Sequence, residues 1–156
     1  MIGPPDVIQR LAQAKQGVDL HTGTFVQLVA YEVARSGFLD GHIRKLRSVY
    51  AGRRDAMLSA MSRAFPPGVS WTKPAGGLFV WATLPESLDA ADFLREALEE
   101  KVAFVPGSSF FADGSGRNTL RLNFTNASRE RIEEGIARLG HALERFVQAG
   151  RAMASS

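Results

Sequence analysis

The stretch NTLRLNFTN, residues 118–126, decides the fold prediction. Apolar and polar side chains alternate in it, with Leu120, Leu122 and Phe124 on one face and Thr119, Arg121 and Asn123 on the other. This period of two is typical of a strand with one buried face. Arg121 stands on the polar face, where a threonine or a valine would pair better with its neighbours. Two interpretations stay open. Arg121 is either an exposed residue of an edge strand or a guanidinium held to bind a carboxylate through two parallel hydrogen bonds.

The segments around this strand predict an α/β fold of the α+β kind. Residues 69–72 and 77–84 are strand-like, residues 90–101 are helical, and a short strand begins at 102 and runs into a loop. A last amphipathic helix follows Ser128, and Asp89 and Ser128 are expected N-caps. The order β-β-α-β-β-α predicts a small, mainly antiparallel sheet with helices on one face. In the 90–101 helix the expected core face is Phe93, Leu94, Ala97 and Leu98.

The first part of the chain is helical by its apolar spacing. We expect helices over 5–17, from the N-cap Thr24 to 36, and over 42–65. The third is long for a domain of this size, which suggests a helix that links two bodies. We therefore expect residues 1–39 to be one part, residues 40–150 a separate domain that starts with the long helix, and residues 151–156 a tail.

The composition excludes several classes of protein. The 156 residues are 45% hydrophobic and 22% charged, as in an ordinary globular protein. A net charge of +3 is weak evidence for a nucleic-acid partner, and the absence of cysteine excludes disulfides and thiolate metal sites. No apolar run approaches the roughly 18 residues of a membrane span. We expect a cytoplasmic protein that binds neither nucleic acid nor membrane.

Other candidate sites are weaker than Arg121. The motif SWTK, residues 70–73, has the spacing of a serine nucleophile and its lysine, but Pro74 follows at once and no helix begins there. Arg44, Arg47 and Arg54 share a face of the long helix, which we interpret as its solvated side. The three histidines lack the spacing of metal ligands. We therefore predict no catalytic residue and no metal ligand within this chain.

Three segments carry a family resemblance. KPAGGLFVWATLP, VAFVPGSSFFADGSGRNTLRLNFTNAS and RIEEGIARLGHAL, in this order, resemble the small C-terminal domain of the pyridoxal-phosphate-dependent aminotransferases of fold type I. The resemblance is strongest to the class I/II branch that contains 2-aminoadipate and broad-specificity aminotransferases. It implies that Arg121 binds the α-carboxylate of the substrate, with Asn123 beside it. It also implies that the backbone of Gly76 and Gly77 lines the substrate pocket.

The resemblance also implies what such an enzyme needs beyond these residues. The Schiff-base lysine of the family belongs to a motif of the form S-x-x-K-x-x-x-x-G-x-R-x-G, and none of Lys15, Lys45, Lys73 and Lys101 stands in that context. We therefore expect residues 1–39 to be a remnant of the large cofactor-binding domain and the chain to be a C-terminal fragment of a longer enzyme. Pyridoxal phosphate would bind in the full-length parent. No residue of this chain is expected to bind it.

The expected partners and the alternatives follow from this interpretation. The partners are an amino acid or 2-oxo acid substrate, the missing N-terminal part of the enzyme, and a second copy in a homodimer. The fragment alone is expected to be inactive, because it lacks the lysine. Two other functions stay open: a carboxylate-binding module that uses Arg121, and the effector half of an aminotransferase-like transcription regulator.

Overall fold

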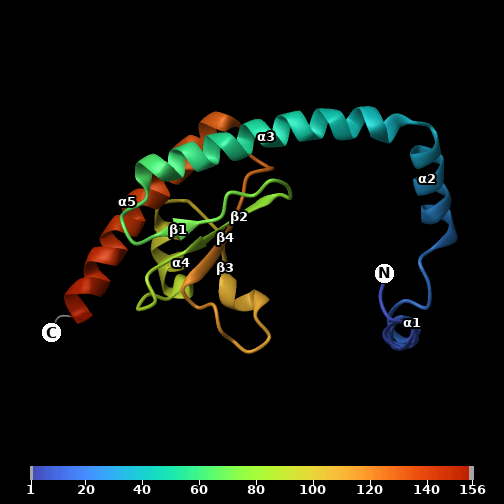
Figure 1. The fold of residues 1–156 in the computed structure, drawn as a ribbon, viewed down its shortest axis with the longest axis horizontal. Helices are drawn as coiled ribbons and strands as arrows, with labels where there is room; N and C mark the ends of the chain where they lie inside the picture. Colours follow the sequence, from blue (N-terminus) through green and yellow to red (C-terminus); the bar gives the residue numbers. More distant parts are fainter. Residues whose placement is uncertain (1, 155–156) are drawn as a thin grey trace. The chain divides into compact units, whose positions relative to one another are not determined.

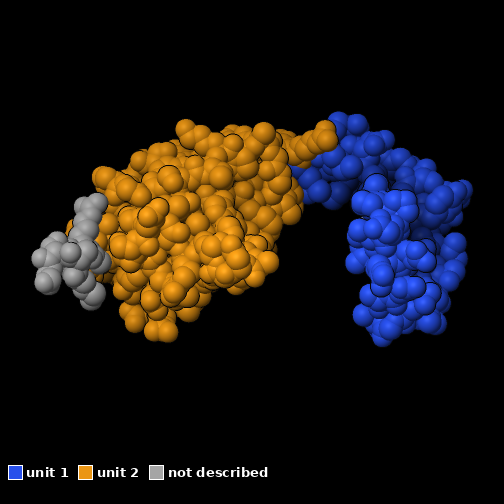
Figure 2. Space-filling model, turned by 60° about the horizontal axis from the view of Figure 1, so that its bottom comes forward, with its two compact units in different colours: residues 1–46 blue, residues 47–156 orange. Residues whose placement is uncertain are grey.

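The computed structural model describes the backbone of residues 2–154 and the side chains up to residue 149. The chain divides into two compact units, residues 1–46 and residues 47–156 (Figure 2). The boundary lies inside the long helix, whereas the predicted division was at its start, after residue 39. Which parent domain each part would belong to stays a prediction.

The first unit consists of helices. It contains α1 (Pro5–Val18), α2 (Thr24–Arg35) and the beginning of α3 (Phe38–Ala64), so the predicted helices are confirmed. Gly37, with φ +76°, lets the chain turn directly from α2 into α3, which begins at Phe38 rather than at residue 42. The prediction that Thr24 caps α2 is wrong, because the N-cap is Gly23 and no side chain caps this end.

The second unit is built on a four-stranded sheet. Its strands are β1 (Ser70–Trp71), β2 (Phe79–Thr83), β3 (Val105–Pro106) and β4 (Thr119–Asn123), in the order β1-β2-β4-β3 with every neighbouring pair antiparallel (Figure 1). The helices α4 (Ala90–Glu99) and α5 (Arg129–Ala154) complete the unit, and a short 3₁₀ helix, η1 (Gly107–Phe110), follows β3. The predicted small antiparallel sheet with helices is confirmed, while η1 replaces part of the expected loop.

The core lies between one face of the sheet and three helices. It consists mainly of buried side chains from β2 and β4 and from α3, α4 and α5: Val80, Ala82, Leu120, Leu122, Met57, Met61, Phe93, Ala97, Ile136, Leu139 and Leu143. The alternation in 118–126 is thus correct, since Leu120, Leu122 and Phe124 are all buried. Leu98 is 51% exposed, so its place in the core was predicted wrongly. The buried residues of α4 are Ala90, Phe93 and Ala97, so its buried face is narrower than the sequence suggests.

Both predicted caps of the second unit are confirmed. The carboxylate of Asp89 accepts a hydrogen bond from the Ala91 N–H at 2.7 Å, and the Arg117 guanidinium pairs with it at 2.7 Å. Burial raises the pKa of this carboxyl, but the hydrogen bonds from Ala91 and Arg117 outweigh burial and leave the pKa below its usual value. At α5, the Arg131 N–H donates to the Ser128 hydroxyl at 3.4 Å.

The last helix runs further than predicted. Its backbone is helical to Ala154, inside the expected tail of residues 151–156, and residues 155 and 156 lie outside the described part of the chain. None of the helices in the part of the chain that the structure describes is both long enough and apolar enough to cross a membrane.

Candidate functional site

Arg121 lies in the middle of β4, a central strand of the sheet, and not on an edge strand. Its cross-strand partners are Trp81 on β2 and Val105 on β3. Opposed residues of an antiparallel pair point to the same face, so Trp81, Val105 and Arg121 share the face opposite to the buried leucines. We call this surface, formed by Phe79, Trp81, Val105, Arg121 and Asn123, the open face.

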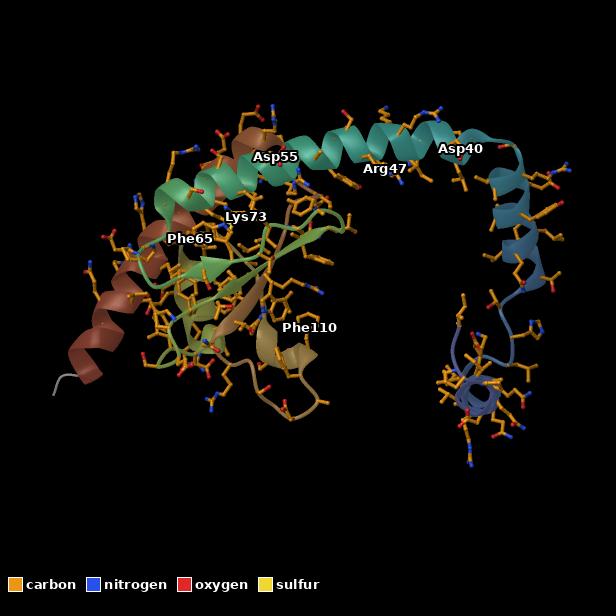
Figure 3. The ribbon with its side chains drawn as sticks, in the orientation of Figure 1. Asp40, Arg47, Asp55, Phe65, Lys73 and Phe110 are labelled. Carbon is orange, nitrogen blue, oxygen red and sulfur yellow. The ribbon has the colours of Figure 1, made fainter. Side chains whose placement is uncertain are left out.

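Two phenylalanine rings hold the guanidinium of Arg121. Its central carbon lies 4.0 Å from the ring centre of Phe79 and 4.4 Å from that of Phe110. Phe79 belongs to β2, on one side of β4, and Phe110 ends η1, which follows β3 on the other side. Figure 3 shows Phe110 on η1. Contacts of this kind between a cation and an aromatic ring are attractive and fix the position of the guanidinium without using its N–H groups.

The side-chain N–H groups of Arg121 are therefore available to bind a ligand. Among the described residues, the Arg121 side chain makes neither a hydrogen bond nor an ion pair, although the strand holds it half-buried. An arginine has five N–H donors in a planar fork that fits the two oxygens of a carboxylate. A fixed guanidinium without a carboxylate of its own is suited to bind an external one.

Asn123 lies two residues further along the open face. Its side-chain oxygen accepts hydrogen bonds from the Thr125 N–H at 2.7 Å and from the Thr125 hydroxyl at 2.8 Å. This local turn fixes the amide, so the remaining polar group that Asn123 offers is its NH₂. The structure places Asn123 beside Arg121 as the sequence predicts. What it binds stays a prediction.

The loop with Gly76 and Gly77 borders the same end of the open face. Phe79, directly after this loop, pairs with Asn123, and the Phe124 N–H donates to the carbonyl of Leu78 at 3.4 Å. Gly77 has φ +84°, in the left-handed region that favours glycine. No hydrogen bond within the described chain joins either glycine to Arg121, so their role at the pocket stays a prediction.

The long helix anchors the loop and the end of β4. The Arg54 guanidinium donates to the Pro74 carbonyl at 3.1 Å, and Arg53 donates to the carbonyl of Thr125. Arg54 was expected on a solvated face. Its side chain is only 26% exposed, and it also pairs with Asp55 at 2.7 Å, so that expectation is wrong for this residue.

A groove of about 490 Å³ adjoins Arg121 and Asn123. It lies between three parts of the chain, which are the segment that leads into β3, the strand β4, and the start of α5. The side chains that line it are mainly apolar, among them Val102, Phe104 and Ile132. Arg131 is a further cation at this groove. The groove therefore provides an apolar space that Arg121 and Asn123 border.

The structure gives no support to the weaker candidate sites. Ser70 forms part of β1, and Lys73 lies in the connection to β2, so no helix places the SWTK pair at its N-terminus (Figure 3). The described residues contain no cluster of three potential metal ligands.

Sequence reasoning missed Phe79 and Phe110 as neighbours of Arg121. The alternation of Phe79 and Trp81 with the buried Val80 and Ala82 is a signal that could have placed Phe79 on the open face. Phe110 gave no such signal, because its position depends on η1.

Comparisons with known proteins identify the family of this chain. A family model, Aminotransferase class I and II, matches residues 1–139. The chain is 50% identical over 140 residues to aromatic-amino-acid aminotransferase 1 of Thermococcus litoralis, covering 90% of this chain and 34% of that protein. It is 48% identical over 143 residues to the 2-aminoadipate transaminase of Thermus thermophilus, covering 92% of this chain and 36% of that protein.

A solved structure and a more distant relative complete the comparison. The α-aminoadipate aminotransferase of Thermus thermophilus, complexed with N-(5'-phosphopyridoxyl)-L-leucine, superposes with a TM-score of 0.84 and 46% identity over 95% of this chain and 38% of that one. An uncharacterized HTH-type transcriptional regulator of Bacillus subtilis is 31% identical over 149 residues, covering 96% of this chain and 30% of that protein.

The chain spans about a third of the length of the curated relatives it matches. The family model nevertheless covers most of the chain, and the sheet and helices of the second unit agree with the solved structure. This protein chain belongs to the class I and II aminotransferases.

Proposed function

We propose that this chain provides the substrate-carboxylate side of the active site of an aminotransferase that moves an amino group from an amino acid to a 2-oxo acid with pyridoxal phosphate. The observation that carries the proposal is Arg121, fixed by two rings on the open face and free of any ion pair with the described residues. The similarity to an aromatic-amino-acid aminotransferase and a 2-aminoadipate transaminase supports it.

Arg121 would bind the carboxylate that every 2-amino acid and 2-oxo acid carries. The guanidinium forms two parallel hydrogen bonds to it and so fixes the orientation of the substrate as well as its position. The NH₂ of Asn123 and the backbone at Gly76 and Gly77 border the same surface and are the next groups we assign to substrate binding. Such charge-assisted hydrogen bonds contribute about 1.5–3 kcal/mol.

The cofactor would be held by other residues. Pyridoxal phosphate supplies the electron sink and carries the amino group between the two substrates. The open face has neither a lysine nor an aspartate, and Lys15, on α1, pairs with Asp19 at 2.7 Å. These residues fit a substrate carboxylate and not the cofactor. We therefore assign the Schiff-base lysine to the part of such an enzyme that these 156 residues do not cover, and expect this chain alone to be inactive.

An amino-transfer assay tests the proposal. The complete product of the gene that encodes this chain, purified with pyridoxal phosphate, is given 2-oxoglutarate with 2-aminoadipate, an aromatic amino acid or leucine, and glutamate formation is measured. We expect transfer, and we expect kcat/KM to fall at least about tenfold in Arg121→Gln. The control is Arg95→Gln, an exposed arginine on α4. Absence of transfer from every amino acid, or equal activity of Arg121→Gln, contradicts the proposal.

The second candidate is the effector half of a transcription regulator, in which the same arginine would bind a carboxylate without turnover. The similarity to the HTH-type regulator of Bacillus subtilis supports this candidate. The support is weaker, because the chain is 31% identical to that regulator and 50% identical to the aminotransferase of Thermococcus litoralis. Carboxylate binding by the complete gene product, without amino transfer and with specific DNA binding, would favour the regulator. A carboxylate-binding module would bind carboxylates but would show neither amino transfer nor DNA binding.

We also propose that the enzyme is a cytoplasmic homodimer. Apolar side chains on α2 are exposed, with Phe25 at 78%, Leu28 at 58% and Val29 at 48%. Exposed apolar surface of this extent is typical of contact with another protein part. The remainder of the enzyme or a second copy would cover it.

A further inference from the structure

The loop after β3 is shaped so that Phe110 reaches Arg121. Gly107, the first residue of η1, is buried against β4, and a Cβ at this position would lie 1.8 Å from the hydroxyl oxygen of Thr119. Only glycine permits this close approach, so η1 begins at a fixed distance from β4. The Thr119 hydroxyl in turn donates to the carbonyl of Gly116 at 2.7 Å and fastens the far end of the same loop.

The two neighbouring phenylalanines of the loop have different contacts. The ring of Phe110 lies 4.4 Å from the Arg121 guanidinium carbon and packs edge-on against Trp81, with 5.5 Å between the ring centres. Phe111 also contacts Trp81, at 6.2 Å between the ring centres, and covers Gly116. Among the described side chains, the cation–ring contacts of Arg121 are with Phe79 and Phe110 and not with Phe111. The exposed fractions are similar, 47% for Phe110 and 40% for Phe111.

An exposed, unpaired arginine has many rotamers, and binding a carboxylate would freeze them. Rings on the two neighbouring elements restrict the guanidinium before a ligand arrives. The hydrogen-bonding capacity of the guanidinium is not reduced by these contacts, because a ring face takes none of its N–H groups.

We propose that Phe79 and Phe110 are positioning residues for Arg121, which hold its guanidinium in the orientation that receives the substrate carboxylate. This inference rests on the proposed function for the identity of the ligand. Phe79 is supplied by the sheet itself, while Phe110 is supplied by η1. Phe110 therefore makes carboxylate binding depend on the conformation of the 107–116 loop.

Two measurements on the 156-residue chain test the inference separately from the proposed function. The first is the order of the Arg121 Nε–Hε bond by ¹⁵N NMR relaxation. We expect Arg121 to be ordered, unlike the exposed Arg95, and to become mobile in Phe110→Leu and in Phe79→Leu. Phe110→Tyr keeps a ring and should keep the order. Phe111→Leu is the matched control and should leave Arg121 unchanged.

The second measurement is the affinity for the probe 4-methyl-2-oxopentanoate. Loss of one cation–ring contact should weaken binding about two- to fivefold in Phe110→Leu, with wild-type affinity in Phe110→Tyr and Phe111→Leu. A mobile Arg121 in the wild type, or equal effects of Phe110→Leu and Phe111→Leu, overturns the positioning role. If the wild type does not bind the probe, carboxylate binding by this chain, and with it the proposed role of Arg121, is overturned. If Phe110→Leu binds as well as the wild type, only the positioning role is overturned.

Discussion

The guanidinium carbon of Arg121 lies 4.0 Å from the centre of the Phe79 ring. The two side chains come from adjacent antiparallel strands, where Arg121 pairs with Trp81 and Phe79 with Asn123, so they are diagonal neighbours on the same face. Diagonal neighbours are within reach of each other when one side chain is long and the other aromatic. The register of β2 and β4 therefore determines the surroundings of the arginine.

Substitution at Gly107 should destabilise the second unit. A Cβ added there would overlap the side chain of Thr119, and β4 or η1 would have to shift. We expect Gly107→Ala to lower the free energy of unfolding by about 1–3 kcal/mol. Chemical denaturation followed by circular dichroism measures the change. In the control Gly76→Ala no atom lies within 4 Å of the added Cβ, and we expect a change below about 0.5 kcal/mol. Equal effects of the two substitutions would contradict the close contact.

Removing the cap of α4 should also destabilise the unit. Asp89→Ala eliminates the hydrogen bond to the Ala91 N–H and the ion pair with Arg117. We expect a loss of about 1 kcal/mol in the free energy of unfolding at neutral pH. Asp92→Ala is the control, because Asp92 is 62% exposed and its nearest cation, Arg95, is 3.8 Å away. A loss as large for Asp92→Ala would show that α4 does not depend on this cap.

Asp89 also gives the stability a pH dependence. Its folded-state pKa is below its ordinary value of 3.8, so its contribution is complete above that value. The contribution is lost as the pH falls through the lowered folded-state pKa. We measure the free energy of unfolding between pH 7 and pH 2. It should fall more steeply with falling pH in the wild type than in Asp89→Asn, and the two slopes should differ only at about pH 4 and below. Slopes that already differ above about pH 5 would contradict the assignment of this pH dependence to Asp89.

The apolar face of α2 should cause self-association of the chain. Phe25, Leu28 and Val29 are exposed on it, and burying them against another copy would remove apolar surface from water. Light scattering should give a mass above that of one chain, rising with concentration. Leu28→Glu with Val29→Glu should reduce it, while Ala34→Glu, on the opposite side of α2, should not. A mass of one chain at every concentration would contradict the prediction.

The sequence predicted the elements well where one periodicity dominates. The alternation around Leu120 and Leu122 correctly placed Arg121 on the face away from the core, and Asp89 and Ser128 were correctly identified as caps. Boundaries that depend on backbone conformation were predicted less well, as the start of α3 after Gly37 shows. The exposure of Leu98 was missed, because helical spacing does not give the width of the face that neighbouring elements cover.

The arginine was found from its strand, but its surroundings were not. The contact with Phe79 needs the register of two strands, and the contact with Phe110 needs the path of η1, which Gly107 determines through its approach to Thr119. The burial of Arg54 was not predicted either, because it also depends on a contact between segments that are far apart in the sequence. Its partner, the carbonyl of Pro74, is twenty residues away in the sequence, and no local pattern indicates it.

The most direct test of the central claim is the affinity of the chain for 4-methyl-2-oxopentanoate with and without the Arg121 guanidinium. NMR titration of the 156-residue chain should show binding in the wild type and in Arg95→Gln. Binding should be at least about tenfold weaker in Arg121→Gln. The methyl ester of the probe, which has no negative charge, should bind no better than the acid binds to Arg121→Gln. Equal affinity of the wild type and Arg121→Gln for the acid, or of the wild type for acid and ester, would contradict carboxylate binding by Arg121.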